Sequence, residues 1–287
     1  MHLRDWYHLT RLDHGLIWGT AVVAGEIIAC GGFPPLSYAI LGFVIPLLIE
    51  VGIFALNDYV DVESDILNKR KDRPLTRNTI SKQYPLYLSL AVLPVAAVLG
   101  AMMYLLMPFL IILLFIGLGI LYNVKLKAVP LVKNSVMGLC IAAPLIGGNL
   151  VITDEVLPIV IIFSVAAFIS GFGREVLKDM MDMVGDEASG CKTLPIIFGL
   201  KKTAWIVSFS LISACAFIVF PFFFPVDSSY FHNAPYIMVS LLACALSFYC
   251  AYSICANQSL ENIKLLRKRS LNILEIGIIA FILGAIL

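Results

Sequence analysis

Residues 36–65 read LSYAILGFVIPLLIEVGIFALNDYVDVESD, an apolar run that ends in three aspartates. These aspartates follow the pattern D-x-x-D-x-x-x-D and are Asp58, Asp61 and Asp65. The pattern recurs after a second apolar run, at a constant offset of 121 residues, as Asp179, Asp182 and Asp186. The chain therefore carries two copies of one carboxylate cluster, and we expect each at the end of a hydrophobic helix, where a polar loop begins.

The composition places the whole chain in a membrane. Of the 287 residues, 60% are hydrophobic and only 14% are charged, where a soluble domain averages about 25% charged. No polar stretch is long enough to form a soluble core. Most apolar runs are long enough for a helix to cross a hydrocarbon layer of about 30 Å, and they lack the alternation of a β-barrel. We count nine of them, at roughly 12–31, 36–57, 84–105, 107–124, 135–153, 156–176, 202–223, 235–256 and 271–287.

The charges divide between the two sides of the membrane. All 20 Lys and Arg residues lie near the amino terminus, at the end of the sixth span, or in the loops after spans two, four, six and eight. The loops on the other side carry only Asp154, Glu155 and Asp227. Cytoplasmic loops are enriched in Lys and Arg. This rule places the amino terminus and both aspartate triplets in the cytoplasm and the carboxyl terminus outside.

The offset between the triplets predicts an internal duplication. Spans one to four form one unit, about 1–134, and spans five to eight form another, about 135–256, with a ninth helix at about 271–287. Both triplets fall on the same side, so the repeats are parallel, as in some transporters. We therefore predict an all-α membrane protein with one domain, 1–287, whose nine-helix bundle directs both triplets into one central cavity.

The spacing of each triplet suits a metal site. On a helix of 3.6 residues per turn, positions i, i+3 and i+7 fall within a wedge of about 60°, so the three carboxylates can face one space. Hard oxygen ligands suit Mg²⁺, which binds through a few carboxylates and the phosphate oxygens of a substrate. Two facing triplets predict two or more Mg²⁺ ions that hold a polyphosphate.

Basic and amide side chains flank both triplets. Asn57 precedes the first triplet, and the residues that follow it include Arg70, Lys71 and Arg73. Arg174 and Lys178 precede the second triplet at i and i+4, so they share a helix face. A site for metal alone would not need them, whereas a diphosphate leaving group would, because cations neutralise the charge that builds as it departs.

The two motifs resemble those of the UbiA superfamily of intramembrane prenyltransferases. Residues 57–65 match its N-D-x-x-D-x-x-x-D pattern, and residues 73–75 match its R-P-L. The second motif, from Arg174 to Pro195, is most similar to archaeal digeranylgeranylglyceryl phosphate synthases, which attach a second geranylgeranyl chain to an ether-lipid precursor. The resemblance implies nine helices around a lipid-open cavity and a prenyl diphosphate donor.

The resemblance also implies roles for individual residues. The aspartates with the most direct part in catalysis are Asp61, Asp65, Asp182 and Asp186. The metal ligands are these four with Asn57, Asp58 and Asp179. The diphosphate ligands are Asn57, Arg73, Lys125, Arg174 and Lys178. The segment Tyr122-Asn123-Lys125-Lys127 resembles a Tyr/Lys segment of the family, and Arg11 resembles an arginine at the start of the first helix. Arg11, Tyr122 and Asn123 are therefore candidates for acceptor binding.

Several alternatives stay open at this point. The acceptor is a lipid such as geranylgeranylglyceryl phosphate, or an aromatic compound such as 4-hydroxybenzoate or a naphthoate. A parallel-repeat cation transporter is the alternative of another class, although its carboxylates should lie nearer the membrane midplane. A CDP-alcohol phosphotransferase would need a D-G-x-x-A-R lead-in that is absent. Nothing in the chain indicates a nucleic-acid partner. The intramembrane carboxylates Glu26, Glu50 and Glu275 have no assigned role.

Overall fold

The computed structural model describes residues 3–67, 73–126, 129, 131–188 and 190–287, and within these ranges it holds helices and loops but no strand. Nine of the described helices are long and apolar enough to cross a membrane, which confirms the predicted all-α membrane fold. The helices are α1 (Leu3–Thr10), α2 (Leu12–Cys30), α3 (Leu36–Leu67), α4 (Tyr84–Ala101), α5 (Leu106–Val124), α6 (Val132–Ile152), α7 (Pro158–Ala188), α8 (Leu194–Phe223), α9 (Ala234–Ala256) and α10 (Leu260–Ile286).

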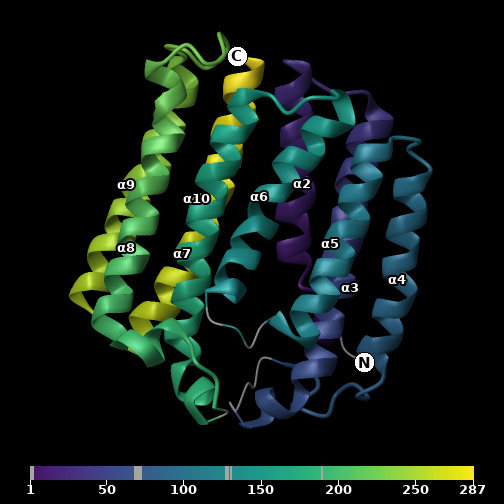
Figure 1. Ribbon diagram of the computed structural model, residues 1–287, viewed down its shortest axis with the longest axis vertical. Coiled ribbons are helices and arrows are strands. Elements are labelled where there is room, and N and C mark those ends of the chain that lie inside the picture. The colour runs from purple at the N-terminus through teal and green to yellow at the C-terminus, as the bar shows by residue number, and fades with distance from the viewer. Residues whose placement is uncertain (1–2, 68–72, 127–128, 130, 189) are drawn as a thin grey trace.

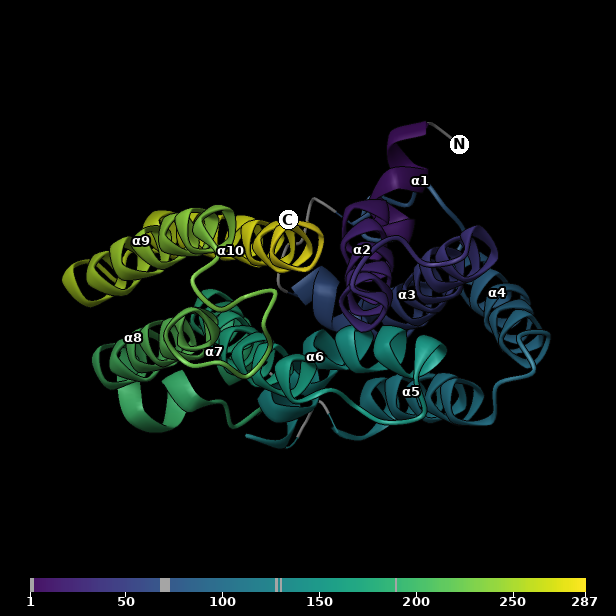
Figure 2. The same cartoon turned by 90° about the horizontal axis from the view of Figure 1, so that it is seen from above.

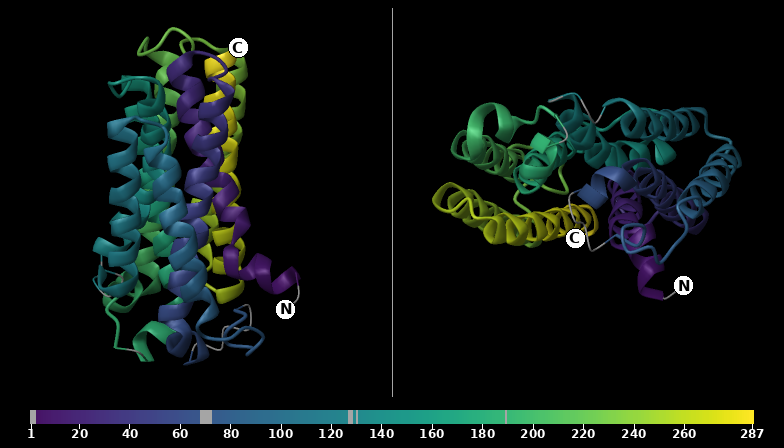
Figure 3. Two further views of the ribbon diagram at one scale, coloured as in Figure 1. Left: turned by 90° about the vertical axis from the view of Figure 1, so that its right-hand side faces the viewer. Right: turned by 90° about the horizontal axis from the view of Figure 1, so that it is seen from below.

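The spanning helices run side by side along the long axis of the molecule (Figure 1). The amino terminus and the aspartate-bearing ends of α3 and α7 lie at one end of the bundle, and the carboxyl terminus lies at the other (Figures 1 and 3). Seen from above, α2 and α6 occupy the middle, with α3, α4 and α5 on one side and α7 to α10 on the other (Figure 2). Both triplets thus share one end of the protein, which we call the motif end.

Small residues allow α2 and α6 to pack closely at the centre. A Cβ atom on Gly25 would collide with the carbonyl oxygen of Leu145, and one on Gly148 would collide with the carbonyl oxygen of Val22. Glycines that let two backbones approach are a common basis of helix packing in membranes, where no hydrophobic force draws helices together. This crossing sets the positions of the two flanking groups of helices.

An aromatic cluster ties the opposite end of the bundle together. The rings of Phe163 on α7 and Phe281 on α10 stack with their centroids 3.8 Å apart. The Tyr230 hydroxyl, from the loop between α8 and α9, donates a 2.8 Å hydrogen bond to the Phe281 carbonyl. Tyr236 donates to the carbonyl of Ile218 and is fully buried. This end is therefore well packed.

Several helix boundaries differ from those expected from hydropathy. α3 continues to Leu67 and α7 to Ala188, so both triplets lie within the last helical turns and do not begin a loop. α10 begins at Leu260, so its first turns carry the basic residues expected in a loop. Hydropathy detects only the apolar part of such a helix. α8 begins at Leu194 but bends at Gly199, whose φ of 77° favours glycine, and its straight part then agrees with the predicted span.

Candidate active site

The first motif is held by a network of amides. The Asn57 amide donates to Asp61 Oδ2 and to Asn123 Oδ1, both at 2.8 Å. The Asn123 amide donates in turn to the backbone carbonyls of Gly119 at 3.0 Å and Ile53 at 3.3 Å. Since Asn123 comes from α5, this network joins α5 to the motif turn of α3. Asn123 therefore orients Asn57 and, through it, Asp61.

Two arginines bind the first aspartate of that motif. Asp58 is 2% exposed, accepts a 2.7 Å hydrogen bond from Arg11 and forms an ion pair with Arg73. Arg73 Nε also lies 3.6 Å from Asp65 Oδ2. The Arg11 guanidinium covers the Phe54 ring at 4.1 Å from its centroid, a favourable cation–π geometry. Asp58 thus anchors two cations at the motif end.

The second motif has a similar arrangement with different partners. Asp179 is 1% exposed, with Lys133 Nζ 2.5 Å from its Oδ1 and the Asn134 amide 2.8 Å from its Oδ2. Lys133 and Asn134 begin α6, so a neighbouring helix supplies both. Lys178 donates to Glu175 at 2.9 Å. As in the first motif, the first aspartate is buried against a cation.

The remaining aspartates are the ones suited to a metal. Among the described residues, no three His, Cys, Asp or Glu side chains already converge in a metal-binding geometry. However, Asp186 Oδ2 is enclosed and has no hydrogen-bond partner, and Asp179 and Asp182 lie close enough for their charges to act on it. A divalent cation would satisfy such an oxygen, and carboxylate oxygens are the ligands that Mg²⁺ prefers. The residues present therefore fit Mg²⁺.

Tyr122 on α5 lies near charged residues of both motifs. Its hydroxyl is within the electrostatic reach of Asp61 from the first motif and of Glu175 and Asp179 from the second. Lys125 follows at the end of α5 and is exposed. The predicted residues Arg70, Lys71 and Lys127 lie outside the described residues.

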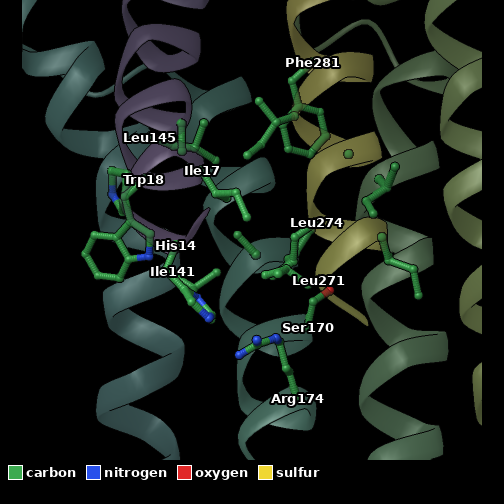
Figure 4. Close-up of a pocket in the computed structure, with 18 residues that line it drawn as sticks. His14, Ile17, Trp18, Ile141, Leu145, Ser170, Arg174, Leu271, Leu274 and Phe281 are labelled. Atoms are coloured by element: carbon green, nitrogen blue, oxygen red, sulfur yellow. The ribbon is translucent and has the colours of Figure 1, made fainter. Parts of the chain in front are cut away.

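A pocket opens beside the motifs between α2, α6, α7 and α10, with an empty volume of about 730 Å³ (Figure 4). His14 and Arg174 lie at one end of this pocket, which we call the lateral pocket, and Phe281 lies at the other (Figure 4). Arg174 is 9% exposed, and its Nε has no hydrogen-bond partner. The walls between the two ends are almost entirely apolar, with Leu145 and Leu274 among them.

A second pocket lies between α2, α3, α5 and α6, with an empty volume of about 610 Å³. Its lining includes Ile45, Met103 and Phe115, and it has almost no polar surface. Trp18 and Pro144 line both pockets, so they form the partition between them. We call this second space the inner pocket.

Sequence reasoning found both motifs but not all of their partners. The sequence predicts Arg174 and Lys178 as diphosphate ligands on one helix face, and this role stays a prediction. In the structure Arg174 borders the lateral pocket and Lys178 binds Glu175. The predicted roles of Arg11 at the acceptor and of Asp58 at the metal stay predictions, and in the structure the two side chains contact each other. Sequence reasoning gave no role to Lys133 and Asn134. A Lys-Asn pair at the start of an otherwise apolar span was the only signal for them.

Comparisons with known proteins identify the family of this chain. The profile of the UbiA prenyltransferase family matches residues 17–273. A digeranylgeranylglyceryl phosphate synthase of Archaeoglobus fulgidus is 30% identical over 99% of this chain and 96% of its own length. The enzyme of the same name from Thermococcus onnurineus is 32% identical over the full length of both chains.

Solved structures show the same fold. A structure of a digeranylgeranylglyceryl phosphate synthase superposes with a TM-score of 0.74 at 23% identity, over 99% of this chain and 98% of the other. A UbiA homologue from Aeropyrum pernix gives 0.77 at 19% identity, over 93% and 98%. One from A. fulgidus, bound to DMAPP and Mg²⁺, gives 0.68 at 18% identity, over 96% and 99%. The chain therefore belongs to the UbiA prenyltransferase family and is a multi-pass membrane prenyltransferase.

Proposed function

We propose that this protein transfers a geranylgeranyl group from its diphosphate to geranylgeranylglyceryl phosphate, with Mg²⁺ as cofactor, in the synthesis of archaeal ether lipids. The full-length relatives named digeranylgeranylglyceryl phosphate synthase support this acceptor. The A. fulgidus homologue solved with a prenyl diphosphate and Mg²⁺ supports the donor and the metal. The observation that carries the proposal is the lateral pocket, which has a cationic end and apolar walls.

The two motifs bind the diphosphate half of the donor. The carboxylates of both motifs would hold two or more Mg²⁺ ions, which would supply neutralisation of the charge that develops on the leaving diphosphate. The ligands are Asn57, Asp61, Asp65, Asp182 and Asp186. Arg73 and Lys178 lie beside them and add donors for the phosphate oxygens, with Lys125 at the exposed edge. Asp58 positions Arg11 and Arg73.

The lateral pocket binds the acceptor. Arg174 meets the acceptor phosphate, because a buried guanidinium with an unused donor gains most from an anion. The apolar walls of the lateral pocket, which include Leu145 and Phe281, cover the geranylgeranyl chain that the acceptor already carries. An aromatic acid would leave most of these walls uncovered. The prenyl tail of the donor occupies the inner pocket, beyond Trp18 and Pro144.

An acceptor panel tests the proposal. Purified protein in lipid vesicles is incubated with geranylgeranyl diphosphate, Mg²⁺ and one of three acceptors: geranylgeranylglyceryl phosphate, 4-hydroxybenzoate or a dihydroxynaphthoate. We expect mass spectrometry to detect the doubly prenylated glyceryl phosphate and no prenylated aromatic product. An aromatic product alone would refute the acceptor assignment.

The role of Arg174 can be tested in the same assay. A hydrogen bond to a charged group contributes about 1.5–3 kcal/mol, so Arg174→Gln should raise the acceptor KM by about 10- to 100-fold. The KM for the prenyl diphosphate should change less than about twofold. Lys202→Gln, an exposed residue on α8, is the matched control. If the donor KM rises and the acceptor KM does not, Arg174 binds the diphosphate, as the motif alone suggested.

The motif end faces the cytoplasm in this proposal, because all the basic loops lie there. An impermeant thiol reagent added to intact cells should label a Ser228→Cys variant, whose new cysteine lies in the exposed loop between α8 and α9. Cys191, near the second motif, should react only after the cells are opened. Labelling of Cys191 in intact cells would reverse the orientation.

A further inference from the structure

One carboxylate in the membrane interior has no part in the arrangement described so far. Glu50 lies in the middle of α3 and is 7% exposed. Within the described parts of the chain, no hydrogen bond or ion pair joins it to another side chain. An ionisable residue inside a membrane helix is costly, and such residues usually face a functional cavity. Glu50 therefore needs an explanation.

Helix geometry places Glu50 on the same face of α3 as residues of the first motif. Glu50, Asn57 and Asp61 are separated by seven and four residues, which places them within about 40° on one face of α3. Glu50 lies about 10 Å along the helix axis from Asn57, on the membrane side of the motif. The allylic carbon of the donor, which the diphosphate leaves, must lie on the membrane side of the motif. The reason is that the apolar tail of the donor extends from this carbon into the membrane.

The surroundings of Glu50 connect the two halves of the site. The charges of Arg11 and Arg174 both act on its carboxylate. Arg11 belongs to the first motif, through Asp58, and Arg174 forms the cationic end of the lateral pocket. The charges of Glu50 and Glu175 both act on the thiol of Cys140, which lies on α6. Glu50 thus lies within electrostatic reach of both the first motif and the cationic end of the lateral pocket.

Glu26, a second intramembrane carboxylate, differs from Glu50 because its oxygens are fully enclosed by the protein. Both oxygens of Glu26 are enclosed without a partner, and one of them lies against the Cα atom of Gly42 on α3. The oxygens of Glu50 are not among the enclosed, unpartnered atoms. Because Glu50 also makes no hydrogen bond to a described residue, its oxygens keep a small accessible surface. Glu50, unlike Glu26, is therefore able to contact a bound acceptor.

We propose that Glu50 is the catalytic base of the transfer and accepts the proton of the acceptor hydroxyl. This inference rests on the proposed function for the identity of that hydroxyl. The bond between the allylic carbon and the diphosphate oxygen breaks, and its electron pair leaves with the diphosphate. The acceptor oxygen forms the new ether bond to that carbon, and its proton passes to the Glu50 carboxylate. No oxidant or other reactant is required.

The isosteric variant Glu50→Gln tests this role, because it keeps the shape but cannot take a proton. A general base contributes about 10²- to 10⁴-fold to a rate. We therefore expect kcat to fall by at least about 100-fold, while the KM values for donor and acceptor change less than about threefold. Glu26→Gln serves as the control and should keep kcat near that of the unchanged protein. If Glu50→Gln keeps kcat within threefold, the inference is wrong.

An acceptor with a thiol in place of the hydroxyl distinguishes a role of Glu50 in proton transfer from a role in packing. A thiol ionises with a pKa of about 8.5 and is far more acidic than an alcohol, so it needs little help from a base. With the 2-thio analogue of geranylgeranylglyceryl phosphate, Glu50→Gln should recover to within about tenfold of the unchanged protein. An equal loss with hydroxyl and thiol acceptors would show that Glu50 supports the shape of the site, and would overturn the assignment.

The acceptor used by the unchanged protein tests the proposed function independently of the role of Glu50. If it uses an aromatic acceptor and not geranylgeranylglyceryl phosphate, the proposed acceptor is wrong. Glu50→Gln is then compared with the unchanged protein on that aromatic hydroxyl and on its thiophenol analogue. The same pattern of loss and recovery supports the role of Glu50, and its absence refutes it.

Discussion

Asp58 offers a sharp test of how the first motif works. The motif pattern alone assigns Asp58 to the metal, yet its carboxylate is 2% exposed and contacts Arg11 and Arg73. We predict that Asp58→Asn acts through these arginines and leaves the affinity for Mg²⁺ unchanged. Asp61→Asn, one turn further along α3, should weaken Mg²⁺ binding directly.

The size of the effect follows from the burial of the ion pairs. Breaking a fully buried pair costs about 3–5 kcal/mol. The Arg11 and Arg73 side chains are 19% and 11% exposed, so solvent screens part of this interaction. We therefore expect a loss of about 2 kcal/mol in transition-state stabilisation, which corresponds to a decrease of about 30-fold in kcat/KM for the prenyl diphosphate.

The assay is prenyl transfer measured over a range of Mg²⁺ concentrations. For Asp58→Asn, the half-saturating Mg²⁺ concentration should shift less than about twofold, whereas for Asp61→Asn it should rise at least about tenfold. Asp58→Asn combined with Arg73→Gln should cost clearly less than the sum of the two single losses, because both changes break the Asp58–Arg73 contact. Equal Mg²⁺ shifts for the two aspartates, or additive losses in the double variant, would refute the reasoning.

Three further predictions concern the motifs, the inner pocket and the central crossing. Asp182→Ala should abolish prenyl transfer while the protein still inserts, as judged by its yield in membranes; full activity would exclude a metal role. Met103→Trp should fill part of the inner pocket and shift the donor preference from geranylgeranyl towards farnesyl diphosphate, as measured with both donors in competition. An unchanged preference would place the prenyl tail of the donor outside the inner pocket. Gly148→Val should lower the thermal unfolding midpoint by several degrees, because its side chain meets the Val22 carbonyl, whereas Gly147→Val, which meets open space, should not.

Much of the fold follows from the sequence because hydropathy and charge are local properties. Nine spans of sufficient length were predicted, and nine are present among the described helices. The ends of α3 and α7 were predicted too short, since helical hydrogen bonds continue through polar residues once the helix leaves the apolar layer. The internal duplication and the boundaries of its two units stay a prediction that the pattern of motifs supports.

The candidate site was predictable only in part. The spacing of the triplets identified the aspartates of both motifs, because residues on one helix turn are related by the helix geometry alone. The contacts of Asp179 with Lys133 and Asn134 come from another helix, and no spacing along the chain encodes them. The same holds for the hydrogen bond from Asn57 to Asn123.

The sequence by itself determined that this is a membrane-embedded protein with two carboxylate motifs that suit Mg²⁺ and a diphosphate. It could not determine which way each cation points. Arg174 and Lys178 share a helix face, yet Arg174 borders the lateral pocket and Lys178 binds Glu175. That difference depends on how α7 is rotated against α2, α6 and α10. Packing between these helices sets the rotation, so the lateral pocket and the arginine at its cationic end are decided only by the tertiary structure.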